Sequence, residues 1–199
     1  MRLVHRQAIG RRVAGRLAPM LLCLALAPAA PARAQQSTGN TAAALLEIQV
    51  VAASLFRFLS YVDWPAEALP PDSPYVIGIV GADAIAGELA SVVASRTVSG
   101  RAVTVRRLKP GDAFDGIHVL FVGGSAPARQ QVLQRVRRAP VLTVTQADGA
   151  LDQGSMINFR LVDGRVRFEV ALDAVDDAGL KVSSRMLGVA LLVRKTRVR

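Results

Sequence analysis

The alternation of apolar and polar positions is clearest near the C-terminal end of the chain. Residues 157–162 (INFRLV) and 166–170 (VRFEV) each carry apolar side chains at every second position. Asp163-Gly164 lies between them, and Asp-Gly is a preferred two-residue hairpin loop because both loop positions need positive φ. One face of the hairpin is apolar and must be buried, while Arg160 and Arg167 fall on the opposite face. The pattern predicts an antiparallel hairpin at the end of a sheet.

The rest of the chain alternates between strand and helix patterns. Apolar residues recur at helical spacing from Thr41, and this helix should end near Trp64 because Pro65 disfavours a helical residue before it. Further predicted strands cover 75–80, 103–108, 117–122 and 141–145, and further predicted helices cover 83–94, 126–138, 173–178 and 183–193. Strands that alternate with helices imply βαβ units. We therefore predict one α/β domain, with a mixed β-sheet that ends in the C-terminal antiparallel hairpin and is flanked by helices on both faces.

The first 34 residues have the three parts of a secretory signal peptide. Five arginines precede an apolar run over 17–30, and the small-x-small site Ala32-Arg33-Ala34 follows. The alternative is a transmembrane anchor, but the run is shorter than the roughly 20 residues that a span needs and contains prolines. We expect cleavage after Ala34 and export to the periplasm, with the Sec and Tat routes both open because of Arg11-Arg12. We expect no later segment to cross a membrane.

Removal of this segment changes the charge and the cysteine content. Six of the 25 basic residues and none of the 15 acidic ones precede Gln35, which leaves 19 basic against 15 acidic residues and a net charge of +4 rather than +10. The high pI is therefore poor support for nucleic-acid binding. The only cysteine, Cys23, leaves with the signal peptide. We divide the mature chain into a flexible N-terminus (35–42), the folded domain (43–193) and a basic tail (194–199).

Candidate chemistry is sparse in the mature chain. Its single histidine, His118, lies inside an apolar strand and is interpreted as a hydrogen-bonded structural residue rather than a base. The turn Gly123-Gly124-Ser125 between a strand and a helix has the form of an anion site, although it lacks a dinucleotide-binding fingerprint. We expect no catalytic group, no metal site and no cofactor. A hydrolase would require His118 exposed beside a carboxylate and a hydroxyl.

Partner binding is the remaining hypothesis, and it rests on exposed aromatic and basic residues. The stretch 56–64 (FRFLSYVDW) concentrates aromatic side chains at the end of one predicted helix. Aromatics and arginine are enriched where proteins bind one another most tightly. The candidate partner-binding residues are Arg57, Tyr61, Trp64, Arg160 and Arg167.

Several short motifs follow the predicted signal peptide in a fixed order: F-x-x-Y-V-x-W-P at 58–65, IVG at 79–81, VLTV at 141–144, GSMINF at 154–159, RVRFEV at 165–170 and AGLKVSSRML at 178–187. Together with the signal peptide, these motifs resemble the YfiR family of periplasmic proteins. The resemblance covers about 43–193, nearly all of the mature chain. It implies a compact α/β domain that tends to dimerise.

The resemblance also implies a function. The best-understood members repress a membrane-bound diguanylate cyclase by binding its periplasmic sensor domain. An outer-membrane lipoprotein can sequester the repressor, which raises cyclic di-GMP and favours biofilm. This sequence departs from relatives that carry cysteine pairs, so redox control of folding does not carry over. The alternatives are a periplasmic small-molecule sensor that uses the glycine turns as a pocket, and more weakly the hydrolase.

Overall fold

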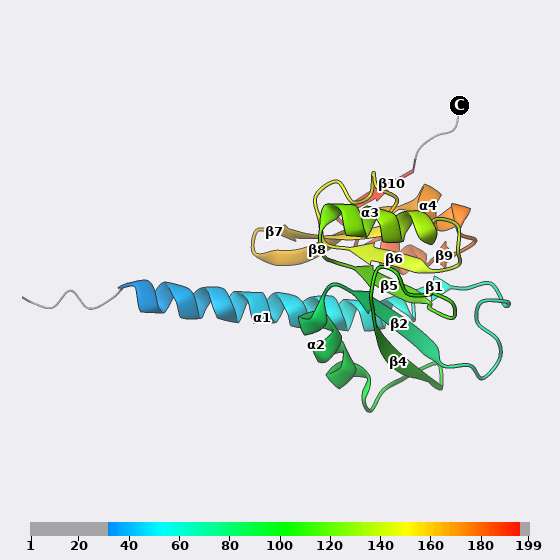
Figure 1. Cartoon of the computed structure of the whole chain (residues 1–199), viewed down its shortest axis with the longest axis horizontal. Helices are drawn as coiled ribbons and strands as arrows, with labels where there is room; N and C mark the ends of the chain where they lie inside the picture. The colour runs from blue at the N-terminus through cyan, green and yellow to red at the C-terminus, as the bar shows by residue number, and fades with distance from the viewer. Residues whose placement is uncertain (1–31, 196–199) are drawn as a thin grey trace, which may run out of the picture.

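An eight-stranded mixed sheet runs through the domain (Figure 1). The computed structural model describes the backbone of residues 32–195 and the side chains of residues 41–195. The strands of the sheet are β2 (Tyr75–Val80), β3 (Thr97–Val98), β4 (Arg101–Leu108), β5 (Val119–Val122), β6 (Leu142–Thr145), β7 (Ile157–Val162), β8 (Arg165–Ala171) and β10 (Leu192–Arg194). A separate ladder pairs β1 (Val62–Asp63) with β9 (Lys181–Val182). The helices are α1 (Ala32–Phe58), α2 (Asp83–Val93), α3 (Ala126–Arg135), α4 (Leu172–Asp177) and α5 (Ser184–Leu187).

The strands follow the order β10-β8-β7-β6-β5-β2-β4-β3. The five strands β4, β2, β5, β6 and β7 are parallel to one another. The hairpin partner β8 runs antiparallel to β7, and β10 lies parallel to β8. This arrangement confirms the predicted α/β class and the mixed sheet with its C-terminal antiparallel hairpin.

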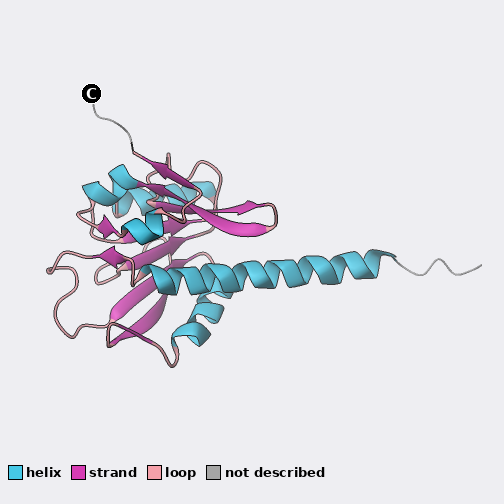
Figure 2. Ribbon diagram, turned by 180° about the vertical axis from the view of Figure 1, so that it is seen from behind, coloured by secondary structure: helices cyan, strands magenta, loops and turns pink. Residues whose placement is uncertain are grey.

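Helices cover both faces of the sheet, as predicted, because its central strands β2, β5 and β6 are buried on both sides. α1 and α2 share one apolar core with Ile77, Val119 and Val144 on one face. α3 contributes Val132 and Leu133 to a second core on the other face. Figure 2 shows the first of these faces, with α1 crossing in front of the strands. The short helices α4 and α5 add apolar side chains to the first core.

The hairpin has the predicted geometry. Asp163 has φ of 49° and Gly164 has φ of 69°, as a primed two-residue turn requires. Phe159 and Phe168 are paired across the strands and both lie against Phe58 of α1, with ring centroids 5.8 and 5.5 Å from the Phe58 ring. The apolar face of the hairpin is therefore turned toward α1, and the opposite face carries the arginines.

The first helix differs from the prediction at both ends. It begins at Ala32 instead of near Thr41, so that residues 35–42, expected to be loose, are helical. It ends at Phe58 rather than near Trp64, because Val62 and Asp63 form the β1–β9 ladder instead. The predicted signal peptide, residues 1–34, lies mostly outside the described residues.

The N-terminal half of α1 projects away from the domain, in the same direction as the tip of the β7–β8 hairpin but further (Figures 1 and 2). We expected no membrane-crossing segment after residue 34. The stretch Thr41–Phe58 is nevertheless long and apolar enough to cross a membrane by length and composition. Its second half supplies the core residues Val51, Leu55 and Phe58, as expected for the helix of a folded domain.

The predicted last helix, 183–193, is wrong in its second half. α5 ends at Leu187, and the chain then joins the edge of the sheet as β10. The backbone N–H of Leu191 donates to the carbonyl of Phe168 at 2.7 Å, which begins this strand pairing. Residues 196–199 of the predicted basic tail lie outside the described part of the chain.

Candidate functional site

His118 connects two neighbouring strands and the loop that follows Trp64. Its backbone N–H donates to the carbonyl of Val76 (2.9 Å), and its ring Nδ1 accepts from the N–H of Val76 (3.0 Å). The other ring nitrogen, Nε2, lies 3.1 Å from the carbonyl of Ala68. Because Nδ1 is an acceptor, the neutral ring must carry its proton on Nε2 and donate it to Ala68.

The surroundings of His118 keep the ring neutral. Its side chain is buried, and it contacts the rings of Trp64 and Tyr75 edge-on. Burial is the largest cause that lowers the pKa of His118, the hydrogen bond to Ala68 opposes that shift, and the positive charge of Arg101 adds to it. Both ring nitrogens are occupied by backbone groups. This geometry confirms the structural interpretation of His118.

The candidate residues at the end of α1 have different surroundings. Arg57 is exposed on the helix. Tyr61 is half-buried against the core, and its carbonyl accepts from the N–H of Ser183 at 2.8 Å. Trp64 packs against Tyr75 and His118, and its indole N–H donates to the carbonyl of His118 at 3.2 Å. The indole of Trp64 thus anchors the loop, and Arg57 is the most accessible of the three.

Arg160 and Arg167, in contrast, lie together. They are directly paired across the hairpin, on the face opposite Phe159 and Phe168. Arg160 also meets Asp148 at 3.4 Å, and the Asp148 side chain is 96% exposed. Since α1 lies on the other face, these arginines do not share a surface with Arg57. The five residues named from the sequence therefore form no single patch.

Two exposed leucines extend the arginine face of the hairpin. Leu192 is paired with Glu169 of β8, and Leu191 lines a shallow depression together with Arg167. Both are exposed, with relative accessibilities of 49% and 42%. We call Arg160, Arg167, Leu191 and Leu192 the hairpin patch. Sequence reasoning missed the leucines because it placed them in a helix.

The glycines of the predicted anion site pack backbone against backbone. Gly123 follows β5, and its N–H donates to the carbonyl of Val80 at 2.8 Å. A Cβ atom on Gly123 would lie 2.8 Å from the carbonyl oxygen of Gly81, and one on Gly81 would lie 3.0 Å from the Gly124 nitrogen. This is the switch point of the sheet, where β2 continues toward β4 and β5 toward β6, and where α/β domains often bind ligands. In this protein the turns at Gly81 and at Gly123-Gly124 pack closely against one another at the switch point. Ser125 then precedes α3.

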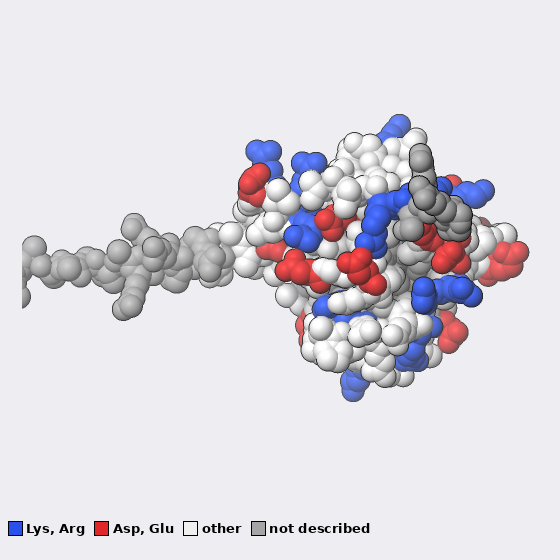
Figure 3. Space-filling model, turned by 90° about the horizontal axis from the view of Figure 1, so that it is seen from above, with Lys and Arg blue, Asp and Glu red and all other residues white. Residues whose placement is uncertain are grey.

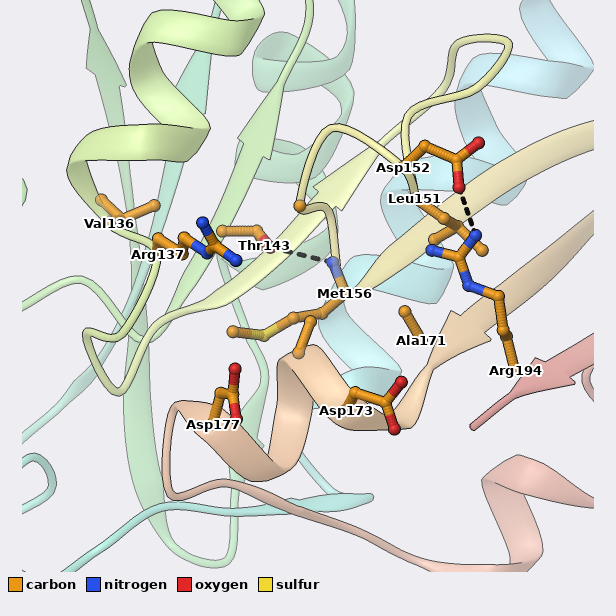
Figure 4. Close-up of a pocket in the computed structure, with 12 residues that line it drawn as sticks. Val136, Arg137, Thr143, Leu151, Asp152, Met156, Ala171, Asp173, Asp177 and Arg194 are labelled. Atoms are coloured by element: carbon orange, nitrogen blue, oxygen red, sulfur yellow. Dashed lines mark hydrogen bonds and ion pairs between the residues drawn. The ribbon is translucent and has the colours of Figure 1, made fainter. Parts of the chain in front are cut away.

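A pocket of about 340 Å³ lies away from these glycines, between the end of α3 and α4 (Figure 4). Arg137 reaches it from the loop after α3, and Asp173 and Asp177 reach it from α4. Asp152 and Arg194 form an ion pair at its rim. Thr143, Met156 and Ala171 are among its other lining residues. The pocket therefore presents charges of both signs around a partly apolar floor.

Basic and acidic side chains are interspersed on the face that is uppermost in Figure 1 (Figure 3). No group of three or more histidine, cysteine or acidic residues with the arrangement of a metal site occurs within the part of the chain that the structure describes. Interspersed charge of this kind does not form the continuous basic stripe typical of a nucleic-acid interface.

The fold and these surfaces define an α/β domain with a mixed sheet and a terminal hairpin, whose candidate sites are an exposed patch and a small charged pocket. The chain belongs to the YfiR/HmsC-like family, whose sequence model matches residues 48–191. This match confirms the resemblance inferred from the motifs. No protein of curated function matches the chain.

One similar solved structure is a conserved domain protein from Vibrio cholerae O1 biovar El Tor, with a TM-score of 0.47 and 13% sequence identity. The match covers 65% of this chain and 57% of that one, so this chain spans little more than half the length of that structure.

Proposed function

We propose that this protein acts in the periplasm and represses a membrane-bound signalling enzyme, a diguanylate cyclase, by binding the periplasmic sensor domain of that enzyme. Family membership supports a regulatory role. Repression of such an enzyme would lower cyclic di-GMP and disfavour biofilm. An outer-membrane lipoprotein that sequesters the repressor would reverse the effect.

The observation that carries this proposal is the hairpin patch. Arg160 and Arg167 face one another directly, and like charges at opposed positions of a sheet destabilise it. The ion pair between Arg160 and the exposed Asp148 offsets little of this cost, because exposed pairs contribute about 0–1 kcal/mol. An acidic partner surface would neutralise both arginines and cover Leu191 and Leu192.

Repression requires a difference in affinity between two states of the partner. A ligand that binds the active and inactive forms of an enzyme with equal affinity does not shift the equilibrium between them. The rigid, paired strands beneath the hairpin patch can hold its charges in one arrangement, so that only one partner conformation matches them. Binding alone then produces the regulation, and the mechanism makes and breaks no covalent bond.

Binding of the purified protein to the isolated periplasmic domain of a cyclase from the same source tests the patch. Arg167→Glu should weaken binding at least about tenfold, since it places like charge against an acidic surface and reversal of a charge at an interface costs several kcal/mol. Arg138→Glu is the matched control, because it makes the same charge change at an exposed site outside the hairpin patch. Equal affinities for the two variants would remove the hairpin patch from the interface.

A second candidate function is the sensing of a small molecule in the pocket of Figure 4. The convergence of Arg137, Asp173 and Asp177 on one cavity favours it, because a few placed charges orient a bound ligand. Thermal-shift measurements with nucleotides and amino acids test this candidate, since a ligand that binds only the folded state raises the Tm. Arg137→Ala should abolish any such shift.

A further inference from the structure

The exposed half of α1 and the tip of the hairpin enclose an apolar groove of about 480 Å³. One wall is a stripe on α1 made by Ala43, Leu46, Glu47 and Val50, which follow helical spacing. The other wall is the hairpin tip, with Leu161 and Arg165. Leu46 and Leu161 both line the groove and are 62% and 57% exposed. Exposed apolar side chains that gather in one place often mark an interaction surface.

We propose that this groove is the surface through which two copies of the chain form a symmetric dimer, with the projecting half of α1 from each copy seated in the groove of the other. This inference deepens the dimer that the family resemblance implies, because it names the interface. It is independent of the partner that the hairpin patch binds.

The α1 stripe is suited to pairing with itself. In an antiparallel arrangement of two α1 helices, Ala43 of one copy lies opposite Val50 of the other, and Leu46 lies next to the two-fold axis. A small residue opposite a larger one allows the helices to approach closely and fills the space between them. A two-fold axis makes each contact between the two helices occur twice. A stripe of two helical turns on each copy therefore forms an interface with two equivalent halves.

The charges at the groove agree with this arrangement. Glu47 and Arg165 both line the groove, and neither forms an ion pair with another of the described residues. Glu47 accepts a hydrogen bond from Gln146 within its own copy. Glu47 of one copy and Arg165 of the other have opposite charge, so their approach favours the antiparallel pairing.

The length of α1 favours a second copy over a partner that covers only the domain. Residues 41–50 span about 15 Å of helix at 1.5 Å per residue. Part of this segment lines the groove beside the hairpin tip, and the N-terminal end of α1 extends past that tip in both views (Figures 1 and 2). Every residue from 41 to 46 is exposed, so no other described element covers the helix there.

The mass of the purified protein in solution, measured by light scattering over a range of concentrations, tests the proposal. The wild-type protein should be a dimer, and Leu46→Glu should weaken it by about a hundredfold or more, since the symmetry applies the loss of one buried leucine twice. Leu192→Glu is the matched control, because it makes the same change at an exposed leucine of the hairpin patch, and it should leave the dimer intact. A dimer that survives Leu46→Glu would place the interface elsewhere.

A disulfide at the axis provides a second measurement. With Cys23 replaced by serine, the chain has no cysteine, so Leu46→Cys introduces the only thiol. Mild oxidation should convert this variant into a covalent dimer, whereas Leu192→Cys should remain largely uncrosslinked. The absence of a Leu46→Cys crosslink in a protein that is dimeric by mass would overturn the antiparallel α1 arrangement.

A membrane surface is the competing occupant of the groove. Vesicles of phosphatidylethanolamine and phosphatidylglycerol would then sediment with the monomeric wild-type protein, and Leu46→Glu would release it. That outcome would overturn the dimer proposal. It would leave the proposed binding of a partner by the hairpin patch untouched.

Discussion

Replacement of His118 by leucine should destabilise the domain by about 2–4 kcal/mol. The change removes the Nδ1 acceptor of the partly buried N–H of Val76, and a donor left unsatisfied away from water costs roughly 1–3 kcal/mol. It also removes edge-on ring contacts with Trp64 and Tyr75, each of which contributes about 0.5–1.5 kcal/mol. Leucine restores part of the apolar packing, so the total stays below the sum of these terms.

The pH dependence of stability provides an internal control for this substitution. The pKa of His118 is lowered in the folded protein, mainly by burial, so the unfolded chain binds a proton more readily. The contribution of the neutral ring to the free energy of unfolding is therefore fully present above the ordinary histidine pKa of about 6.5. This contribution is lost as the pH falls through the lowered pKa of the folded protein. His118 is the only histidine after residue 34, and carboxylates titrate at lower pH.

Urea denaturation followed by far-ultraviolet circular dichroism at several pH values measures both effects. The wild-type free energy of unfolding should decline as the pH falls below about 6.5, and His118→Leu should be less stable at neutral pH with a flatter profile. A cost below about 1 kcal/mol, or an unchanged slope in the variant, would refute the assigned hydrogen bonds.

Three further predictions concern the packing of the domain. Gly123→Ala should lower the free energy of unfolding by about 1–3 kcal/mol in urea denaturation, because the new Cβ would lie 2.8 Å from the carbonyl oxygen of Gly81. An unchanged free energy of unfolding would show that the turns at Gly81 and Gly123 can move apart. Phe58→Ala should cost about 3–5 kcal/mol in the same assay, since Phe58 packs between α1 and the hairpin. Asp152→Asn should cost less than about 1 kcal/mol because its ion pair with Arg194 is largely exposed, and a larger loss would assign this pair a structural role.

Local patterns allowed the central strands and the hairpin to be predicted from the sequence. β2 occupies the predicted residues 75–80, because a short apolar run bounded by turn residues has few alternatives in a buried sheet. Asp163-Gly164 specifies its turn through two positive φ angles, which the neighbouring residues do not change. His118 was interpreted correctly because a lone histidine in an apolar strand usually satisfies backbone groups.

Errors occurred where distant segments determine the local structure. Val62 is a strand residue because it pairs with Val182, 120 positions away, and the helical spacing of α1 carries no sign of that pairing. Leu192 leaves the predicted helix because the open edge of β8 accepts a strand there. The hairpin patch and the groove beside α1 could not be predicted from the sequence for the same reason. Each combines segments that only the fold brings together. The tertiary pairing overrides the local propensity in both cases.

Repression by contact is tested most directly by the rate at which membranes that carry the cyclase convert GTP to cyclic di-GMP in the presence of this protein. Wild-type protein at the periplasmic side should lower that rate, and Arg167→Glu should require at least about ten times more protein for the same effect. A rate that wild-type protein leaves unchanged, in membranes whose cyclase is active, would contradict the proposed function.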